Sequence, residues 1–224
     1  MAKAPRIPRE DNVAVIGLGR FGAAVAQSLV RLGHDVLGID SDGAIVQSMA
    51  DKLTHVVQAD TTDADTLKRL GVGDYRHAVV GIGTNIEASL LTTLALSELG
   101  VADIWAKAIN PNHGRILSRT GAHHVVHPEA EMGERVAHLV TGQLMDFIAF
   151  EDDFAIAKVP TPASAAGVSL GKAGLRARHG VTVIGFKPAN AGFSYATSDT
   201  VLNLGDIIIV SGTTQDVERF AAKA

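Results

Sequence analysis

The residues best suited to chemistry form a glycine-rich turn near the start of the chain. Gly17, Gly19 and Gly22 have the spacing G-x-G-x-x-G, with Arg20 and Phe21 between them. The first glycine permits a tight turn, the second lets a phosphate approach the backbone, and the third lets a helix pack against a strand. The free N–H groups at the start of that helix favour an anion. The turn therefore predicts a phosphate site, and a glycine turn without a ligand is the alternative.

An acidic residue follows at the position where a nucleotide ribose would lie. Asp40 comes directly after an apolar run at 36–39, which itself follows the helical pattern that the glycine turn begins. A carboxylate at the end of a second strand accepts hydrogen bonds from a ribose diol and repels a 2′-phosphate. The combination of strand, turn, helix, strand and acid therefore predicts a nucleotide site that disfavours NADP.

Other polar residues have two readings each. Arg20 can make a bidentate contact with a phosphate oxygen, or it is a solvated arginine at a helix start. Glu129 opens a later helix, where it either reaches a cation bound to phosphates or is a surface carboxylate stabilised by the helix dipole. His123, His124 and His127 lie close together, so a metal site competes with ordinary polar residues at a strand end.

The elements that must position these residues alternate regularly up to residue 127. Apolar runs predict strands at 13–16, 36–39, 54–59, 77–82, 103–109 and 122–127, and helices are expected between them. Six such units predict an α/β fold of the Rossmann type with a doubly wound parallel sheet. Ligands of such sheets bind beyond the carboxyl ends of the strands. The residues expected at one crevice are Gly19, Asp40, Asp60, Gly83 and Lys107.

The rest of the chain predicts a crossover helix and a smaller domain. A helix is expected over 128–145, where the completed sheet leaves it little to cover, so it packs on another subunit or bridges to a second domain. The run Glu151-Asp152-Asp153 marks a change in composition. Strands expected at 154–159, 181–186 and 206–210, with helices at 170–179 and 213–223, predict a small α+β domain. The expected division is a loose N-terminal arm at 1–10, a nucleotide-binding domain at 11–127, a crossover helix and linker at 128–150, and a C-terminal domain at 151–224.

Composition limits the classes of function. The chain has 224 residues and no cysteine, and the absence of cysteine excludes disulfides, thiolate nucleophiles and cysteine-ligated metals. Its net charge of -4 does not predict a nucleic-acid-binding surface. No apolar run is long enough to cross a membrane, and the start of the chain lacks a signal peptide, so we expect a cytoplasmic protein. The second domain carries no clustered polar set for acid–base chemistry. Binding without catalysis is the simpler interpretation, and an NAD-dependent oxidoreductase is the alternative.

Four segments carry a family resemblance, namely VIGLGRFG, GHDVLGID, GIGTNIEASLLTT and IWAKAINPNHGRILSRTGAHHVVHPEAEMG. They resemble the RCK, or KTN, regulatory subunits of bacterial potassium uptake systems of the Ktr and Trk type. The resemblance covers nearly the whole chain and is strongest from about residue 12 to residue 136. The block at 154–212 is similar to the small C-terminal domain of that family more loosely.

This resemblance implies a mechanism. Members of the family pair through the crossover helix, and the dimers assemble into an octameric ring on the cytoplasmic face of a potassium-translocating membrane subunit of the KtrB or TrkH type. ATP favours the active ring and ADP the inactive one, and NAD or NADH is the alternative nucleotide. The same fold regulating another cation transporter is a further alternative.

The resemblance also assigns roles to residues. It implies that Gly17, Gly19 and Gly22 hold the phosphates and Asp40 the ribose, with Phe21 in the same turn. The resemblance also implies that Asp60 and Thr61 lie beside the adenine and that Gly83 and Lys107 line the crevice. Arg20 is implied to contact the terminal phosphate, which in one reading belongs to the nucleotide of the neighbouring protomer. Glu129 is implied to help hold a divalent or monovalent cation. In several relatives the C-terminal domain binds cyclic di-AMP between two protomers, and Arg176 is the candidate phosphate contact here.

Overall fold

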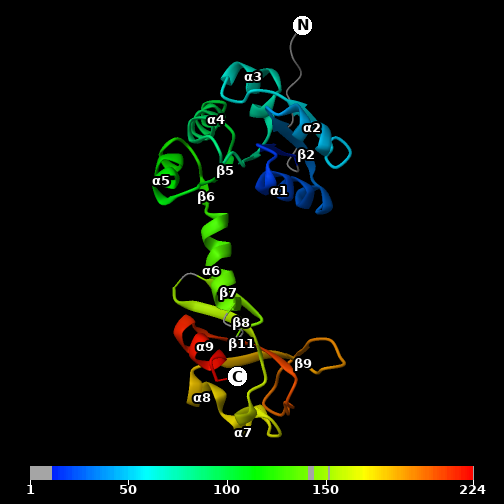
Figure 1. The fold of residues 1–224 in the computed structure, drawn as a ribbon, viewed down its shortest axis with the longest axis vertical. Helices are drawn as coiled ribbons and strands as arrows, with labels where there is room; N and C mark the ends of the chain where they lie inside the picture. Colours follow the sequence, from blue (N-terminus) through cyan, green and yellow to red (C-terminus); the bar gives the residue numbers. More distant parts are fainter. Residues whose placement is uncertain (1–11, 141–143, 151, 224) are drawn as a thin grey trace. The chain divides into compact units, whose positions relative to one another are not determined.

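The computed structural model describes residues 12–140, 144–150 and 152–223, so the expected N-terminal arm at 1–10 lies outside the described residues. The chain divides into two compact units, one ending at Glu129 and the other starting at Ala130. Each unit has its own sheet (Figure 1). Each also has its own apolar core.

The first unit is built on a six-stranded parallel sheet in the order β3-β2-β1-β4-β5-β6. The strands are β1 (Asn12–Ile16), β2 (Asp35–Asp40), β3 (His55–Gln58), β4 (His77–Val80), β5 (Asp103–Lys107) and β6 (His124–Val126). The strand order reverses between β1 and β4, and this switch point is where doubly wound sheets bind their ligands. The α/β fold predicted from the sequence is confirmed.

Helices flank this sheet, and each has a local reason for its ends. They are α1 (Arg20–Arg31), α2 (Gly43–Met49), α3 (Ala64–Arg69), α4 (Ile86–Glu98) and α5 (Pro111–Arg119), with a short 3₁₀ turn η1 (Val72–Asp74). The side chains of Asp42, Asp63, Asn85 and Asn110 cap the amino ends of α2 to α5 by accepting backbone N–H bonds. Of these five helices, only α1 begins without a side-chain cap, at Gly19, so the N–H groups of its first turn are available to a ligand.

The helix α6 (Pro128–Val140) follows the last strand of the sheet. The helix predicted over 128–145 was too long, because Leu144 and Met145 are not helical and Met145 donates its N–H to the Lys158 carbonyl, directly before β7 (Asp146–Phe150). None of the residues of α6 is buried, which agrees with the expectation that a completed sheet leaves this helix little to cover.

The second unit contains a five-stranded antiparallel sheet in the order β10-β9-β11-β8-β7. Its remaining strands are β8 (Phe154–Pro160), β9 (Thr182–Lys187), β10 (Ser194–Tyr195) and β11 (Ile207–Thr213). The helical elements are η2 (Ala163–Ala165), α7 (Leu170–Ala173), α8 (Leu175–His179) and α9 (Thr214–Ala221). Buried side chains from β8, β11 and α9 contribute much of the core.

Two departures from the predicted elements in this unit have simple causes. The single helix expected over 170–179 is two short helices, because Gly174 between them is left-handed, with φ 58° and ψ 34°. The acidic run treated as a break lies between β7 and β8, which pair from Asp146 with Lys158 to Phe150 with Phe154. Asp152 and Asp153 both have positive φ angles, a conformation that aspartate tolerates in the turns of hairpins.

Candidate functional site

The glycine turn joins β1 to α1, and each glycine meets a different neighbour. Gly17 has a φ of 83° and donates its N–H to the Ile39 carbonyl at 2.8 Å. A Cβ on Gly22 would lie 1.8 Å from the Gly17 carbonyl oxygen, whereas a Cβ on Gly19 would meet no atom within 4 Å. Gly22 therefore serves the packing of the turn, and Gly19 leaves open space at the uncapped start of α1.

Asp40 connects this turn to the end of β2. Its Oδ2 atom accepts the Leu18 N–H at 2.6 Å, and its Oδ1 atom accepts the Asp42 N–H at 2.9 Å. A carboxylate has about four acceptor positions, so capacity is left for a ribose diol after both bonds. The carboxylate thus holds the turn in place and still carries the acceptor chemistry predicted from the sequence.

Four predicted residues lie close together beside the turn: the charged Arg20, Lys107 and Glu129, and the aromatic Phe21. The Lys107 ammonium lies 2.5 Å from Glu129 Oε1 and 5.7 Å from the centre of the Phe21 ring. The Lys107 side chain is 12% exposed and that of Glu129 is 66% exposed. The hydrogen bond from Lys107 lowers the pKa of Glu129, and the nearby charges of Lys107 and Arg20 lower that pKa further.

Gly83 borders the same cluster at the carboxyl end of β4. A Cβ placed there would lie 3.2 Å from the Lys107 ammonium nitrogen. The missing side chain of Gly83 thus makes room for the end of the Lys107 side chain, a role that the sequence alone did not indicate.

Asp60 and Thr61 follow β3 but face different surroundings. Asp60 is exposed, and hydrogen bonds from the Thr62 backbone and hydroxyl lower its pKa. The Thr61 hydroxyl is buried and lies 2.9 Å from the hydroxyl of Thr92 on α4. The Thr61 side chain therefore packs into the first unit, and only Asp60 offers its side chain to a ligand.

The residues present fit a cation only in a limited way. Across the described ranges, no group of three or more His, Asp or Glu side chains is arranged to hold a metal ion. Glu129 fits as one oxygen ligand of a cation whose other ligands are phosphates or groups of a second protomer. The histidines have separate contacts: His123 Nδ1 accepts the Ile104 N–H, and His124 stacks on Trp105 and pairs with Asp103.

Sequence reasoning passed over His113, which is buried on α5. Its Nδ1 atom accepts the Ile109 N–H at 3.4 Å, and burial, followed by the charge of His127, lowers its pKa. His113 thereby supports the loop after β5, next to Lys107. The signal in the sequence was the position of His113, which lies at the start of α5 and four residues after the strand expected at 103–109.

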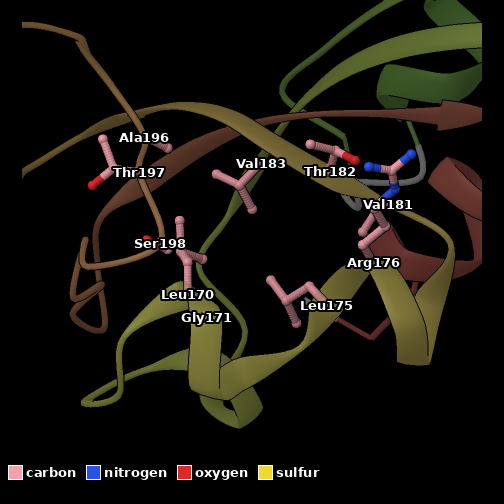
Figure 2. A pocket seen from close by; sticks show the side chains of 10 residues that line it. All are labelled: Leu170, Gly171, Leu175, Arg176, Val181, Thr182, Val183, Ala196, Thr197 and Ser198. Carbon is pink, nitrogen blue, oxygen red and sulfur yellow. The ribbon is translucent and has the colours of Figure 1, made fainter.

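Arg176 lines a pocket in the second unit that has a volume of about 230 Å³. Figure 2 shows Arg176 and Thr182 at one end of this pocket and Thr197 and Ser198 at the other. Apolar side chains of Leu170, Leu175, Val181 and Val183 form the wall between them. The pocket thus combines a cationic group, hydroxyl groups and an apolar surface.

The sequence matches two known domain families over most of its length. Residues 13–128 match the TrkA-N domain, and residues 154–224 match the TrkA-C domain. The chain is 38% identical over 212 residues to the Ktr system potassium uptake protein C of Bacillus subtilis, covering 94% of this chain and 96% of that protein. It is 34% identical over 204 residues to the Ktr system potassium uptake protein A of Vibrio alginolyticus, covering 91% and 93% of the two chains.

Solved structures share the fold at lower identity. The GsuK RCK domain aligns with a TM-score of 0.65 at 20% identity, over 96% of this chain and 47% of that one. The GsuK channel bound to NAD aligns with a TM-score of 0.63 at 20% identity, over 92% and 38% of the two chains. This chain thus spans less than half the length of those solved chains.

Proposed function

The chain belongs to the family of Trk and Ktr potassium uptake proteins that contain a TrkA-N and a TrkA-C domain, and from this premise we propose that it is a nucleotide-binding regulatory subunit of a potassium uptake system. It binds a nucleotide on the first unit and acts on a potassium-translocating membrane partner from the cytoplasmic face. Among the described residues no helix is long and apolar enough to cross a membrane.

One observation carries the nucleotide part of this proposal. The uncapped start of α1 and the open space at Gly19 lie at the switch point of the sheet, and Asp40 follows β2 at the same edge. Backbone N–H groups at such a helix start suit a phosphate, and the carboxylate suits a ribose. GsuK structures bound to NAD and to ADP share the fold over 92% and 58% of this chain.

We assign the discrimination between ATP and ADP to Arg20. Arg20 is the first residue of α1 and its side chain is exposed. Its positive charge contributes to lowering the pKa of Glu129. A guanidinium contact with the terminal phosphate is worth roughly 1.5–3 kcal/mol. Reversing a ring from mostly inactive to mostly active needs about 5.5 kcal/mol of differential binding. The sites of an octameric ring share that differential binding free energy, so one contact between Arg20 and the terminal phosphate at each site is sufficient. ADP lacks the terminal phosphate and so loses this contact.

The test is a calorimetric titration of the purified protein with ATP, ADP and NADH. We expect Arg20→Ala to narrow the ratio of ATP to ADP affinity by about tenfold or more, because the lost contact exceeds about 1.4 kcal/mol. Arg31→Ala is the matched control, since Arg31 is an exposed arginine at the other end of α1 that donates to Ser28. An unchanged ratio in Arg20→Ala rejects the assignment.

The same titration separates this proposal from an NAD-dependent oxidoreductase. Binding of NADH alone, with no difference between ATP and ADP, would favour the enzyme and a search for its substrate. A client other than a potassium transporter, within the same fold, is tested by reconstitution with the membrane partner and measurement of ion flux.

The pocket at Arg176 supports a second ligand, cyclic di-AMP. Its volume of about 230 Å³ lies below the range of about 300–1,000 Å³ typical of pockets for whole small-molecule ligands. Half of a symmetric dinucleotide fits that size, and a second protomer would supply the other half of the site. The exposed guanidinium of Arg176 is suited to a bridging phosphate.

A further inference from the structure

Three polar side chains lie together at the amino ends of β4, β5 and β6, whereas the proposed nucleotide site lies at the carboxyl ends of the strands. Asp103 Oδ2 lies 2.9 Å from His77 Nδ1, and Asp103 Oδ1 lies 3.2 Å from His124 Nε2. One carboxylate is thus shared by two imidazoles from the two neighbouring strands. We infer that this His77–Asp103–His124 cluster is a pH-sensitive attachment of the edge strand β6, which becomes stronger when the imidazoles are protonated.

The register of the sheet brings the cluster and an indole ring to one face. His77 lies opposite Asp103 in the pairing of β4 with β5, and Trp105 lies opposite His124 in the pairing of β5 with β6. Alternate residues of a strand point to opposite faces, so Asp103 and Trp105 share the face away from the buried Ile104. The Trp105 indole donates its Nε1–H to Asp103 Oδ2 at 3.0 Å and stacks on the His124 ring, with centroids 4.1 Å apart.

The strand β6 depends on such side-chain contacts because it is short and lies at the edge of the sheet. It has three residues, and in the described sheet its neighbour is β5. His124 is its first residue, so the contacts of His124 with Asp103 and Trp105 hold the start of the strand. The chain leaves the sheet after β6 and continues into α6, so the attachment of β6 also fixes the point from which α6 begins.

The carboxylate of the cluster stays ionised over the pH range in which imidazole titrates. Burial raises the pKa of Asp103, but hydrogen bonds from His77 and Trp105 and the charges of His124 and His77 outweigh burial, so that this pKa is lowered on balance. The side chains of His77 and His124 are 36% and 49% exposed, so protons from solvent reach them. An ordinary imidazole gains its proton near pH 6.5. Hydrogen bonds between charged groups are stronger than neutral ones, so acidification through that range strengthens the bonds to Asp103.

The neighbouring groups affect this pH dependence in different ways. Arg76 and His123 directly precede the strands β4 and β6, and an arginine keeps its charge throughout this range. Nδ1 of His123 accepts the Ile104 N–H at 3.0 Å, so protonation of His123 would break that bond and weaken β6. On the side of β1, His77 lies beside the uncharged Val13. The helices α4 and α5 pack on the opposite face, in the core around Ile104.

The test uses the fluorescence of Trp105, which is the single tryptophan of the chain. A protonated imidazole quenches the emission of an indole stacked on it, so the emission of the full chain should rise as the pH increases from about 5 to about 8. His124→Gln should remove this rise. Asp103→Asn keeps an acceptor for the Trp105 indole and removes the charge, so it should move the midpoint of the rise to lower pH by roughly half a unit or more.

A second arm measures the attachment of β6 by amide hydrogen exchange, corrected for the intrinsic effect of pH on exchange. Peptides that cover 123–127 should be about 2- to 5-fold more protected at pH 6 than at pH 8, the size expected for partly exposed ion pairs. Asp103→Asn should lose this difference, and His77→Gln should lose part of it. His123→Asn keeps an acceptor for the Ile104 N–H but does not titrate, so it should retain the difference or enlarge it.

Either arm can overturn the inference. It fails if the rise in fluorescence persists in His124→Gln or keeps its midpoint in Asp103→Asn. It also fails if β6 of the wild type is equally protected at both pH values, a measurement that needs no variant to fold. His55→Gln is the matched control and should behave as the wild type in both arms, since His55 is exposed on β3 at the other edge of the sheet. No readout involves a nucleotide, so the result is independent of the proposed nucleotide site.

Discussion

At the residue scale, the glycines of the turn separate packing from ligand binding. A Cβ on Gly22 would overlap the Gly17 carbonyl oxygen, and one on Gly19 would project into open space. Gly19 also has a φ of -61°, which any residue adopts. The spacing of the motif could be read from the sequence, but the distinct steric demand at each glycine depends on which backbone atoms lie opposite.

The two positions therefore predict opposite results in a matched pair of variants. Gly22→Ala should lower the free energy of unfolding by about 1–3 kcal/mol or more, because a well-packed contact must move apart. Gly19→Ala should change it by about 0.5 kcal/mol or less, yet weaken nucleotide binding, because its methyl group occupies the approach of a phosphate. Chemical denaturation and calorimetry with ADP measure both effects. Tight ADP binding by a folded Gly19→Ala would contradict the assigned phosphate site.

Other residue roles could not be read from spacing alone. Lys107 and Gly83 were both expected at the crevice, but their contact joins two strands, so it depends on the pairing of β4 with β5. Thr61 was expected beside the adenine, and its hydroxyl lies against that of Thr92, 31 positions further along the chain. The direction of a side chain at a strand end depends on the loop that follows, and periodicity does not encode that direction.

At the element scale, the regular alternation of strands and helices in the first unit was predictable because both faces of a parallel sheet are buried. The strands at its centre are apolar runs, and the helices have side-chain caps or glycine stops. The second unit was harder to predict. The strand β7 has exposed side chains at Ile148, Ala149 and Phe150, so its pattern does not alternate cleanly, and only its pairing with β8 identifies it.

Gly174 determines the geometry of α7 and α8 and so the position of Arg176. It is left-handed, and a Cβ added to it would have no neighbouring atom closer than 4.0 Å, so Gly174→Ala adds backbone strain and no clash. We expect a loss of about 1 kcal/mol of stability together with weaker cyclic di-AMP binding. Arg176→Ala should weaken cyclic di-AMP binding without loss of stability, since Arg176 is exposed. Thermal unfolding and calorimetry separate the two, and full binding by Arg176→Ala rejects this site.

At the scale of the whole molecule, exposed apolar side chains in several parts of the described chain include one set on α6 and one on α4 and α5. Met132, Val136 and Val140 are 53%, 45% and 80% exposed and recur every four residues along α6. Leu91 and Leu94 of α4 and Ile116 of α5 are also exposed, at 41%, 41% and 45%. Residues four apart lie on one face of a helix, so the first set forms a stripe. Exposed apolar surfaces of this kind mark protein–protein contacts.

Two such surfaces suit a ring in which two kinds of interface alternate. We assign the α6 stripe to pairing within a dimer and the α4–α5 surface to assembly of dimers into the proposed octamer. Breaking either interface alone leaves pairs joined through the other one. Val136→Asp and Leu94→Asp should therefore each reduce the octamer to dimers, and the double variant should give monomers, because a charge is costly to bury in an apolar contact.

Sedimentation equilibrium measures the three masses directly, with thermal unfolding as the check that each variant is folded. Glu134→Ala on α6 and Glu87→Ala on α4 are matched controls at exposed polar positions of the same helices, and both should leave the octamer intact. If Val136→Asp alone gave monomers, the α4–α5 surface would have no assembly role of its own. If the double variant stayed octameric, both surfaces would be free of subunit contacts, and the ring would have to form through other parts of the chain.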